Sequence, residues 1–417
     1  APTTAAPTTA APTTAAPINT SCNSSGCGHY LPGQSCQCTK ECTKYKNCCD
    51  DFNATCNAKP PAPNKTTVIP PGAYSLNWEA SGPSFFKDFV FVTVDEMHGA
   101  AQFLDSHSAQ QNGLTSAGKG SAKIRLGGRG ENKRQSINVH TKYAWNPSQS
   151  ILAMMKYKHL PLGPGVWPGF WTTNSDVVWP AGGELDILEY ANEDVSKVTF
   201  HTDKICSLAG HEPCKTDYFN KQFGCKPPQR EMPGSYFANV PGVIAAEWTP
   251  GHIKVFHIPE KEIPADLDTY PNPDKWDKWL LASLPFGKQG CEDVAKPQEL
   301  VLDIGLCGDW AGGAWAESGQ AQATGFSEKA GTCKVDIWDP PNDCCTKFAS
   351  SKQADKAYQN AYFDINWVRV FTKAGAKAAR STSGTARRNG APLHATWLPA
   401  NATRKHPHRS SQHKWWK

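Results

Sequence analysis

The chain has 417 residues, which is too long for one small domain and long enough for a sizeable core plus an accessory module. With 34 glycines and 33 prolines, its turn-rich composition is typical of all-β proteins and argues against a mainly helical fold. The net charge of +5 is too modest to indicate a nucleic-acid-binding protein, and no stretch approaches the roughly 18 apolar residues that a membrane-spanning helix needs.

The chain opens with a low-complexity segment. The sequence Ala-Pro-Thr-Thr-Ala occurs three times within residues 1–16. Pro and Thr at this density cannot bury a core, so residues 1–20 are predicted to be a stalk of the kind that carries O-linked glycans. Neither Met nor an apolar leader stands at residue 1, and we therefore expect a signal peptide that has been removed.

A cysteine-rich segment follows in residues 21–57. It holds eight of the 16 cysteines of the chain, and the other eight lie between Cys206 and Cys345. Even numbers in both places predict disulfide bonds and an extracellular protein, either free or associated with a cell wall. Five Asn-X-Ser/Thr sequons indicate the same compartment: Asn19, Asn23, Asn53, Asn64 and Asn401.

The order of the first eight cysteines, with one vicinal pair, resembles that of a somatomedin-B domain: Cys22, Cys27, Cys36, Cys38, Cys42, Cys48, Cys49 and Cys56. The resemblance implies a small cross-linked knot that binds a protein partner, while a stable spacer without a partner stays open as the alternative. Eight cysteines allow 105 pairings, so the connectivity is not predicted. A zinc site is disfavoured, because His29 is the only histidine nearby.

Residues 73–373 are predicted to be one all-β domain, which a Pro-rich linker at 58–72 separates from the cysteine-rich segment. One short helix is predicted at 274–284, and short strands are predicted between turn signals at 89–94, 242–248, 253–258 and 300–304. Many short strands in about 300 residues indicate a β-sandwich or jelly roll. Residues 374–417 are basic and lack apolar periodicity, and they are predicted to be a disordered, solvated tail.

The densest chemistry lies in Gly183–Glu189, where three carboxylates are interleaved with the aliphatic residues of a buried strand. Side chains alternate along a strand, so Glu184 and Asp186 share one face and Glu189 points to the other. One extra residue, accommodated as a β-bulge, would turn all three carboxylates into one cleft. A bulge and two long side chains leaning together would also bring the glutamates within the roughly 5–5.5 Å used by retaining glycosidases. Solvated acids on a strand edge are the structural alternative.

This stretch and its flanks resemble glycoside hydrolase family 16, and in particular its fungal-type endo-1,3(4)-β-glucanases, the laminarinases. The matching segments follow the order of the family: Gly165–Trp171, Trp179–Glu189, Phe200–Thr202, Cys307–Gly312 and Tyr362–Val370. Some family members have only one residue between the Asp and the second Glu, whereas Ile187 and Leu188 intervene here, as in the bulged laminarinase branch. The resemblance implies a curved β-sandwich (jelly roll) with an open cleft.

The resemblance also implies roles for single residues. Glu184 would be the nucleophile and Glu189 the general acid/base, with Asp186 as a third catalytic residue that orients Glu184 and helps Glu189 to hold a proton. Six residues are expected to bind the sugar, although a lone histidine or tryptophan on a strand is more often structural: Trp167, Trp171, Trp179, His201, Trp310 and Arg134. No cofactor or metal is expected, and the structural calcium of many family members is not predicted, because Asn366 stands at a carboxylate position.

These observations predict a secreted, monomeric endo-β-glucanase. Its substrate would be a β-glucan polysaccharide, cleaved at internal β-1,3 or mixed β-1,3/1,4 bonds by retaining double displacement. Two alternatives stay open: a glucan transglycosylase on the same scaffold, and a non-catalytic glucan-binding or matrix protein. Relatives of the last kind typically lack one or both glutamates, and this chain has both.

Overall fold

The computed structural model describes residues 36–39, 41–52, 72–130, 133–204, 206, 215–217, 222–287, 295–373 and 379–380. Contacts divide the chain into two units, residues 1–69 and 70–417, each with a core of its own. The predicted stalk, most of the linker, the five sequons and the tail beyond residue 380 lie outside the described residues.

Disulfide bonds hold the described part of the first unit. The Cys36–Cys49 and Cys42–Cys48 bonds surround the helical turn α2 (Cys42–Tyr45). The buried cluster of this unit is small and consists of Cys38, Cys42, Cys49 and Phe52. Among the described residues no cysteine is free, so the cysteines of this part form bridges, as predicted, and are not available to zinc.

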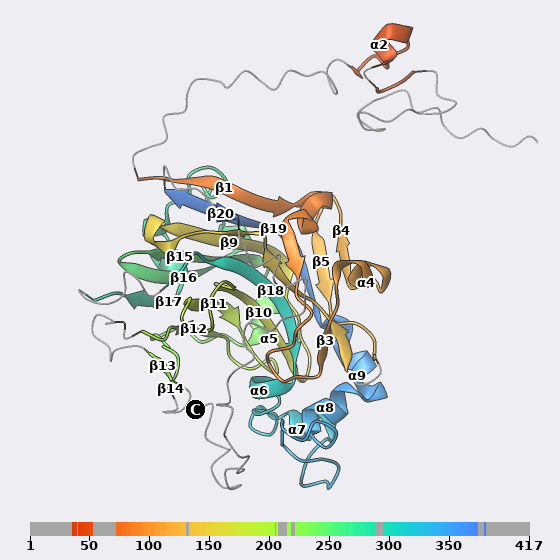
Figure 1. The fold of residues 1–417 in the computed structure, drawn as a ribbon, viewed down its shortest axis with the longest axis vertical. Helices are drawn as coiled ribbons and strands as arrows, with labels where there is room; N and C mark the ends of the chain where they lie inside the picture. Colours follow the sequence, from red (N-terminus) through yellow and green to blue (C-terminus); the bar gives the residue numbers. More distant parts are fainter. Residues whose placement is uncertain are drawn as a thin grey trace, which may run out of the picture. The chain divides into compact units, whose positions relative to one another are not determined.

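Two large sheets make up the second unit (Figure 1). The larger has eight strands in the order β17-β16-β15-β9-β19-β5-β4, with β1 beside β19. Their bounds are β1 (Tyr74–Ser81), β4 (Thr115–Ala117), β5 (Ala122–Arg125), β9 (Ile151–His159), β15 (Gly242–Thr249), β16 (His252–Pro259), β17 (Leu280–Pro285) and β19 (Tyr362–Lys373).

The smaller sheet has six strands in the order β12-β11-β10-β18-β7-β2. Their bounds are β2 (Phe89–Phe91), β7 (Asn138–Thr141), β10 (Val166–Thr173), β11 (Glu184–Glu189), β12 (Lys197–His201) and β18 (Glu299–Leu306). All pairings in both large sheets are antiparallel.

Short elements complete the described part of the unit. Three minor pairs are β3 (Ala101–Phe103) with β6 (Arg134–Ser136), β8 (Tyr143–Ala144) with β20 (Ala379–Arg380), and β13 (Thr216–Asp217) with β14 (Gln222–Phe223). The α-helices are α4 (Ser106–Gln111), α5 (Gly234–Asn239), α6 (Gly308–Ala311), α7 (Gln320–Thr324), α8 (Cys344–Ala349) and α9 (Lys352–Ala357). The 3-10 turns are η1 (Gly82–Asp88), η2 (Pro147–Gln149), η4 (Glu260–Glu262), η5 (Pro273–Lys275), η6 (Asp277–Trp279) and η7 (Tyr358–Asn360).

The two sheets share one continuous apolar core. Phe170, Leu185 and Ile304 of the smaller sheet belong to the same buried cluster as Met155 and Val368 of the larger sheet. Because side chains alternate along each strand, the neighbours of these core residues are directed to the opposite face of the smaller sheet. The prediction of an all-β jelly roll is confirmed. No helix in the described ranges has the length and apolar character needed to cross a membrane.

The local predictions had a mixed outcome. The strands expected at 242–248, 253–258 and 300–304 are β15, β16 and β18, whereas the strand expected from residue 89 ends at Phe91. The predicted helix at 274–284 is wrong, because this segment forms parts of η5 and η6 and then β17. The indoles of Trp276 and Trp279 pack in a second buried cluster, with residues of the larger sheet such as Phe256. The backbone after them pairs with β16. Pairing with a neighbouring strand therefore outweighs the weak helical periodicity.

Candidate active site

A β-bulge in β11 sets the direction of the acidic side chains. Phe170 of β10 pairs with Leu188, but the next residue, Trp171, pairs with Asp186, which leaves Ile187 as the extra residue. The pairing of β11 with β12 shifts over the same stretch. The extra residue restores the parity between Asp186 and Glu189, so the predicted bulge is confirmed.

Two tryptophans hold the two glutamates. The indole Nε1 of Trp179 donates a hydrogen bond of 2.9 Å to Oε2 of Glu184. The indole Nε1 of Trp167 donates one of 2.7 Å to Oε1 of Glu189. Both indoles are only partly buried, as is Trp171. The structure therefore brings these tryptophans to the site, where at least two of them orient carboxyl groups.

His201 and Asp186 form a second polar contact beside Glu184. Nε2 of His201 lies 3.1 Å from Oδ2 of Asp186 and 3.8 Å from Oε1 of Glu184. The imidazole also packs against the ring of Trp179, with 5.4 Å between the centroids. Asp186 itself is buried, so its place between the glutamates is determined by this contact and by the strand pairing. The structure thus places His201 beside the acidic group, and its expected contact with the sugar stays a prediction.

The surroundings of Glu184 and Glu189 favour the protonated forms of their carboxyl groups. Burial raises the pKa of Glu189 well above the usual range, and the neighbouring charge of Asp186 raises it further. Burial and Asp186 likewise raise the pKa of Glu184, while the hydrogen bond from Trp179 opposes this shift. Carboxyl groups this close do not all ionise near neutral pH, so the site can combine one carboxylate with one carboxylic acid.

A fourth carboxyl group, that of Asp303, lies on the same face of the smaller sheet as the glutamates. The sequence did not predict its place in the site. Gly169 of β10 pairs with Glu189 on one side and with Asp303 of β18 on the other. Asp303 is 4% exposed and accepts hydrogen bonds from the Trp171 side chain and the Gly169 backbone. A Cβ atom on Gly169 would come within 2.6 Å of Oδ1 of Asp303, so the glycine provides the room. The only signal in the sequence is one acid in an aliphatic strand, which by itself does not indicate a site.

Replacing Asp303 by asparagine is expected to change how stability depends on pH. Burial raises the pKa of Asp303 to about 8, whereas the unfolded chain has an ordinary aspartate. Between about pH 4 and pH 8 the folded state holds this proton and the unfolded state does not, so the free energy of unfolding falls by about 1.4 kcal/mol per pH unit. Asp303→Asn should remove this contribution in urea denaturation measured from pH 4 to pH 8.

Glu184 and Glu189 also have raised pKa values, which contribute to the same fall of the free energy of unfolding with pH. Asp303→Asn is therefore expected to reduce this slope without abolishing it. Asp277→Asn, at an exposed position of η6, is the matched control and should leave the slope unchanged. An equal slope in Asp303→Asn and the parent protein would contradict the assignment.

Arg134 is engaged elsewhere, so its expected contact with sugar hydroxyls is not supported. Its side chain is 3% exposed, and its Nε donates to the carbonyl oxygen of Ala349. A terminal nitrogen lies 2.7 Å from Oδ1 of Asp355, and the guanidinium also lies over the ring of Tyr358. These partners belong to α8, α9 and η7, and the guanidinium therefore joins this helical region to β6. The few residues around Arg134 in the sequence do not indicate which surface its side chain faces.

Arg134→Ala is therefore expected to act on stability. We expect the free energy of unfolding to fall by about 2–3 kcal/mol, because the buried carbonyl oxygen of Ala349 loses its donor and the packing of the buried guanidinium on Tyr358 is lost. Arg129→Ala is the matched control: Arg129 is exposed, lies 3.7 Å from the same Asp355, and should cost at most about 1 kcal/mol. Chemical denaturation measures both. A large rise in KM for Arg134→Ala with unchanged stability would restore the sugar-binding role.

Trp310 is a supporting residue in the structure. It is 9% exposed and packs edge-on against Trp167, with 5.7 Å between the ring centroids. Ala191, Ala311 and Ala314 complete this small cluster. The expectation of a sugar platform at Trp310 is therefore not supported, because little of its ring is accessible. Its contact instead stabilises the indole that binds Glu189.

Two groups of side chains hold atoms of the kind that bind metal ions. Glu184, Asp186 and His201 each offer a ligand atom, and these atoms lie within 4.8 Å of one another. Nε2 of His201 already contacts Oδ2 of Asp186, and Trp179 donates to Oε2 of Glu184. At the position expected to correspond to a calcium site, Asn366 donates to the carbonyl oxygen of Gly120. The neighbouring Asp364 pairs with the ammonium of Lys123 at 3.2 Å. Oδ1 of Asp364 and Oδ1 of Asn366 are buried without a hydrogen-bond partner in the described part of the chain, so the absence of calcium at this position stays a prediction.

The chain is similar in sequence and in fold to known proteins. A model of XgeA-like, catalytic GH16 domains matches residues 88–371, and a model of the somatomedin B domain matches residues 20–59. A probable glycosidase of Schizosaccharomyces pombe is 32% identical over 258 residues, which are 57% of this chain and 60% of that protein. An endo-1,3(4)-β-glucanase of Emericella nidulans is 26% identical over 332 residues, 75% of this chain and 50% of that protein.

The fold is also similar to that of laminarinase 16A from Phanerochaete chrysosporium, solved with 6-O-glucosyl-laminaritriose in both donor and acceptor sites. The TM-score is 0.58 at 25% identity, and the match covers 72% of this chain and 100% of that one. The chain spans about half to three-fifths of the length of the two curated relatives.

Proposed function

Since the chain belongs to glycoside hydrolase family 16, in the XgeA-like group, we propose that it is an endo-β-glucanase acting on internal β-1,3 or mixed β-1,3/1,4 bonds. The observation that carries the proposal is the bulge at Ile187, which directs Glu184 and Glu189 to one face, where each carboxyl group is bound by an indole. The names of the relatives support a β-glucan as the substrate.

The geometry supports a double displacement. Glu184, bound on one oxygen by Trp179, attacks the anomeric carbon, and the glycosidic bond breaks. Glu189 gives its proton to the departing oxygen, and its raised pKa supports this role. Glu189, now ionised, takes a proton from water, which attacks the anomeric carbon and releases Glu184. Two displacements at one carbon leave its configuration retained.

Asp186 and His201 support the nucleophile in this proposal. His201 lies within reach of both Asp186 and Glu184, so it limits the rotation of the two carboxyl groups. The charge of Asp186 contributes to keeping Glu189 protonated before the first step. Both residues are therefore assigned roles in positioning and in electrostatics beside the two glutamates.

The proposal includes a modular extracellular protein. A stalk at 1–20, a disulfide knot at 21–57, a linker at 58–72, a catalytic domain at 73–373 and a basic tail at 374–417 would follow one another. The disulfides and the somatomedin B match support the knot and an oxidising compartment. We propose that the knot binds a protein partner while the catalytic domain acts as a monomer.

The test is incubation of the purified chain with laminarin, lichenan and agarose, beside Glu184→Gln. Cleavage of laminarin or lichenan that disappears in the variant is expected, and the ratio of the two rates defines the linkage preference. NMR of the first product should show a β-anomer. Oligosaccharides longer than the starting material would indicate transglycosylation through the same intermediate. Binding without cleavage would overturn the proposal in favour of a recognition protein.

A further inference from the structure

Asp303, the fourth carboxyl group of the site, has no role in the double displacement described above. It lies on β18 between two cross-strand neighbours, Gly169 on β10 and Asn138 on β7. Side chains of directly paired residues lie on the same face of a sheet, with Cβ atoms about 4.5–5.5 Å apart, so Asp303 and Asn138 face each other. The row continues through Gly169 to Glu189 on β11, so Asp303 and the acid/base share one row of the sheet.

The indole of Trp171 lies over Gly169, beside Asp303. A Cβ atom on Gly169 would come within 2.7 Å of Cδ1 and 3.0 Å of Nε1 of Trp171, and within 2.6 Å of Oδ1 of Asp303. The indole nitrogen and the carboxyl oxygen therefore meet above the glycine, where Trp171 donates a hydrogen bond to Asp303. The ring of His140 packs edge-on against the same indole, with 5.9 Å between the centroids. These contacts fix the position of Trp171 in the site.

On its other side Asp303 faces an acceptor that lacks a donor. Asn138 is 7% exposed, and its Oδ1 is buried with no hydrogen-bond partner among the described residues. An unsatisfied buried acceptor costs free energy, and buried polar atoms of folded proteins rarely stay unpaired. A carboxylic acid has one O–H donor, whereas a carboxylate has none. Of the two forms of Asp303, only the protonated one can therefore donate to this oxygen.

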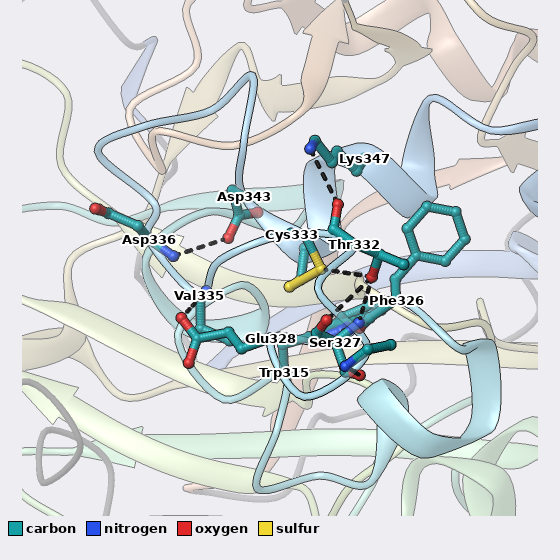
Figure 2. The surroundings of a disulfide bond; sticks show 12 residues. Trp315, Phe326, Ser327, Glu328, Thr332, Cys333, Val335, Asp336, Asp343 and Lys347 are labelled. Carbon is teal, nitrogen blue, oxygen red and sulfur yellow. Dashed lines mark hydrogen bonds between the residues drawn. A yellow bond between two sulfur atoms is a disulfide. The ribbon is translucent and has the colours of Figure 1, made fainter.

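Another buried aspartate, Asp343, has different surroundings. Figure 2 shows the amide of Asp336 directed at Asp343, which is 1% exposed. The amide and the hydroxyl of Thr346 donate to its other oxygen, at the start of α8. Burial raises the pKa of Asp343, but these three donors oppose the shift, because they stabilise a carboxylate. Asp303 instead has donors on one side and an acceptor on the other, an arrangement that suits a carboxylic acid.

The charges around Asp303 also favour its neutral form. The titratable groups that surround it are these: Asp95, Lys133, His140, Asp186, Glu189 and Glu299. Lys133 pairs with Asp95 at 2.9 Å, and His140 lies 3.2 Å from Glu299, so both bases already have carboxyl partners. Burial, with a smaller contribution from the charges of Asp186 and Asp95, raises the pKa of Asp303 to about 8.

We propose that Asp303 is a positioning residue that works as a carboxylic acid, donating a hydrogen bond to Oδ1 of Asn138 and accepting the one from Trp171. It thereby holds the indole over Gly169 without placing a negative charge beside the acid/base. An ionised Asp303 raises the pKa of Glu189 further, which would make Glu189 a weaker proton donor. The effect on Glu189 rests on the proposed function, whereas the proton on Asp303 does not depend on it.

The direct test is infrared spectroscopy of the intact chain between about pH 6 and about pH 10, with Asp303→Asn as the reference. At the acidic end we expect the C=O stretching band of a carboxylic acid that Asp303→Asn lacks, and this band should disappear with a midpoint of about 8. Asp277→Asn, at an exposed position of η6, is the matched control and should leave the band unchanged. Identical spectra of the parent and Asp303→Asn at the acidic end would show an ionised Asp303 and overturn the inference.

Asn138→Ala tests the partner of the proton. Loss of one acceptor should weaken the binding of the proton by Asp303 about tenfold, which moves the midpoint of the band about one pH unit lower. The fold is checked by circular dichroism. An unchanged midpoint in the folded variant would overturn the hydrogen bond to Asn138.

The enzymatic readout compares two replacements of Asp303. Asp303→Asn keeps a donor for Asn138 and an acceptor for Trp171, whereas Asp303→Leu has a similar shape and provides neither. We expect Asp303→Leu to raise the KM for laminarin more than Asp303→Asn does, because Trp171 is no longer held. Equal effects of the two replacements would contradict the positioning role. A parent protein that shows the band but cleaves no glucan would overturn the proposed function and leave the proton assignment intact.

Discussion

Glu184→Gln is expected to lower kcat on laminarin or lichenan by about three orders of magnitude or more, because an amide cannot form the glycosyl–enzyme bond. The fold should persist, since glutamine keeps an oxygen that can accept the bond from Trp179. Activity is measured as reducing ends per enzyme, and circular dichroism reports the fold. The KM should change much less than kcat, because the variant still presents the same binding surface.

Asp186→Asn is the matched control for this experiment. It removes one charge from the same strand and keeps a side chain that can bind His201. We expect a smaller loss of rate than in Glu184→Gln. We also expect the pH profile to move to lower pH, because the charge of Asp186 raises the pKa of both glutamates. Near-normal turnover by Glu184→Gln would show that the nucleophile has been misassigned.

Glu189→Gln is expected to lower hydrolysis of the natural glucan by about 100- to 10,000-fold, the usual contribution of a general acid. An aryl glycoside with an acidic phenol as the leaving group should lose far less in its first step, because that phenolate departs without a proton. The comparison of the two substrates therefore separates an acid from a nucleophile. Equal losses on both substrates would contradict the role of Glu189.

The pH dependence gives an independent readout of the same residue. In the parent enzyme kcat/KM should fall on the alkaline side as Glu189 loses its proton, and the raised pKa of Glu189 places this limb above the ordinary range of a glutamate. Glu189→Gln cannot lose that proton, so its residual activity should not show this limb. Trp167→Phe removes the hydrogen bond that favours the ionised form and should move the limb of the otherwise intact enzyme to higher pH.

The choice among the open alternatives depends on products as well as rates. A glycosyl–enzyme intermediate is released by water or by a sugar hydroxyl, and the same two glutamates serve both reactions. Residues around the acceptor position decide between them by excluding water or by binding sugar.

The sequence by itself determined the features that depend on local order along the chain. The alternation of short strands and turns predicted the all-β fold, because a strand with one buried face has a period of two. The two residues between Asp186 and Glu189 predicted the bulge, since parity along one strand is a property of the sequence alone. The even number of cysteines in each segment predicted disulfide bonds, although it left their partners open.

The tertiary structure decided everything that depends on neighbours from distant parts of the chain. Asp303 joins the site only because β18 pairs with β10 across Gly169, and Arg134 leaves it because α8 and α9 supply its acceptors. Part of the segment 274–284 forms a strand because the edge of β16 is available for pairing. The free energy of each such side chain is set by the burial, charges and hydrogen-bond partners around it, which strand pairing and packing assemble and local sequence does not specify.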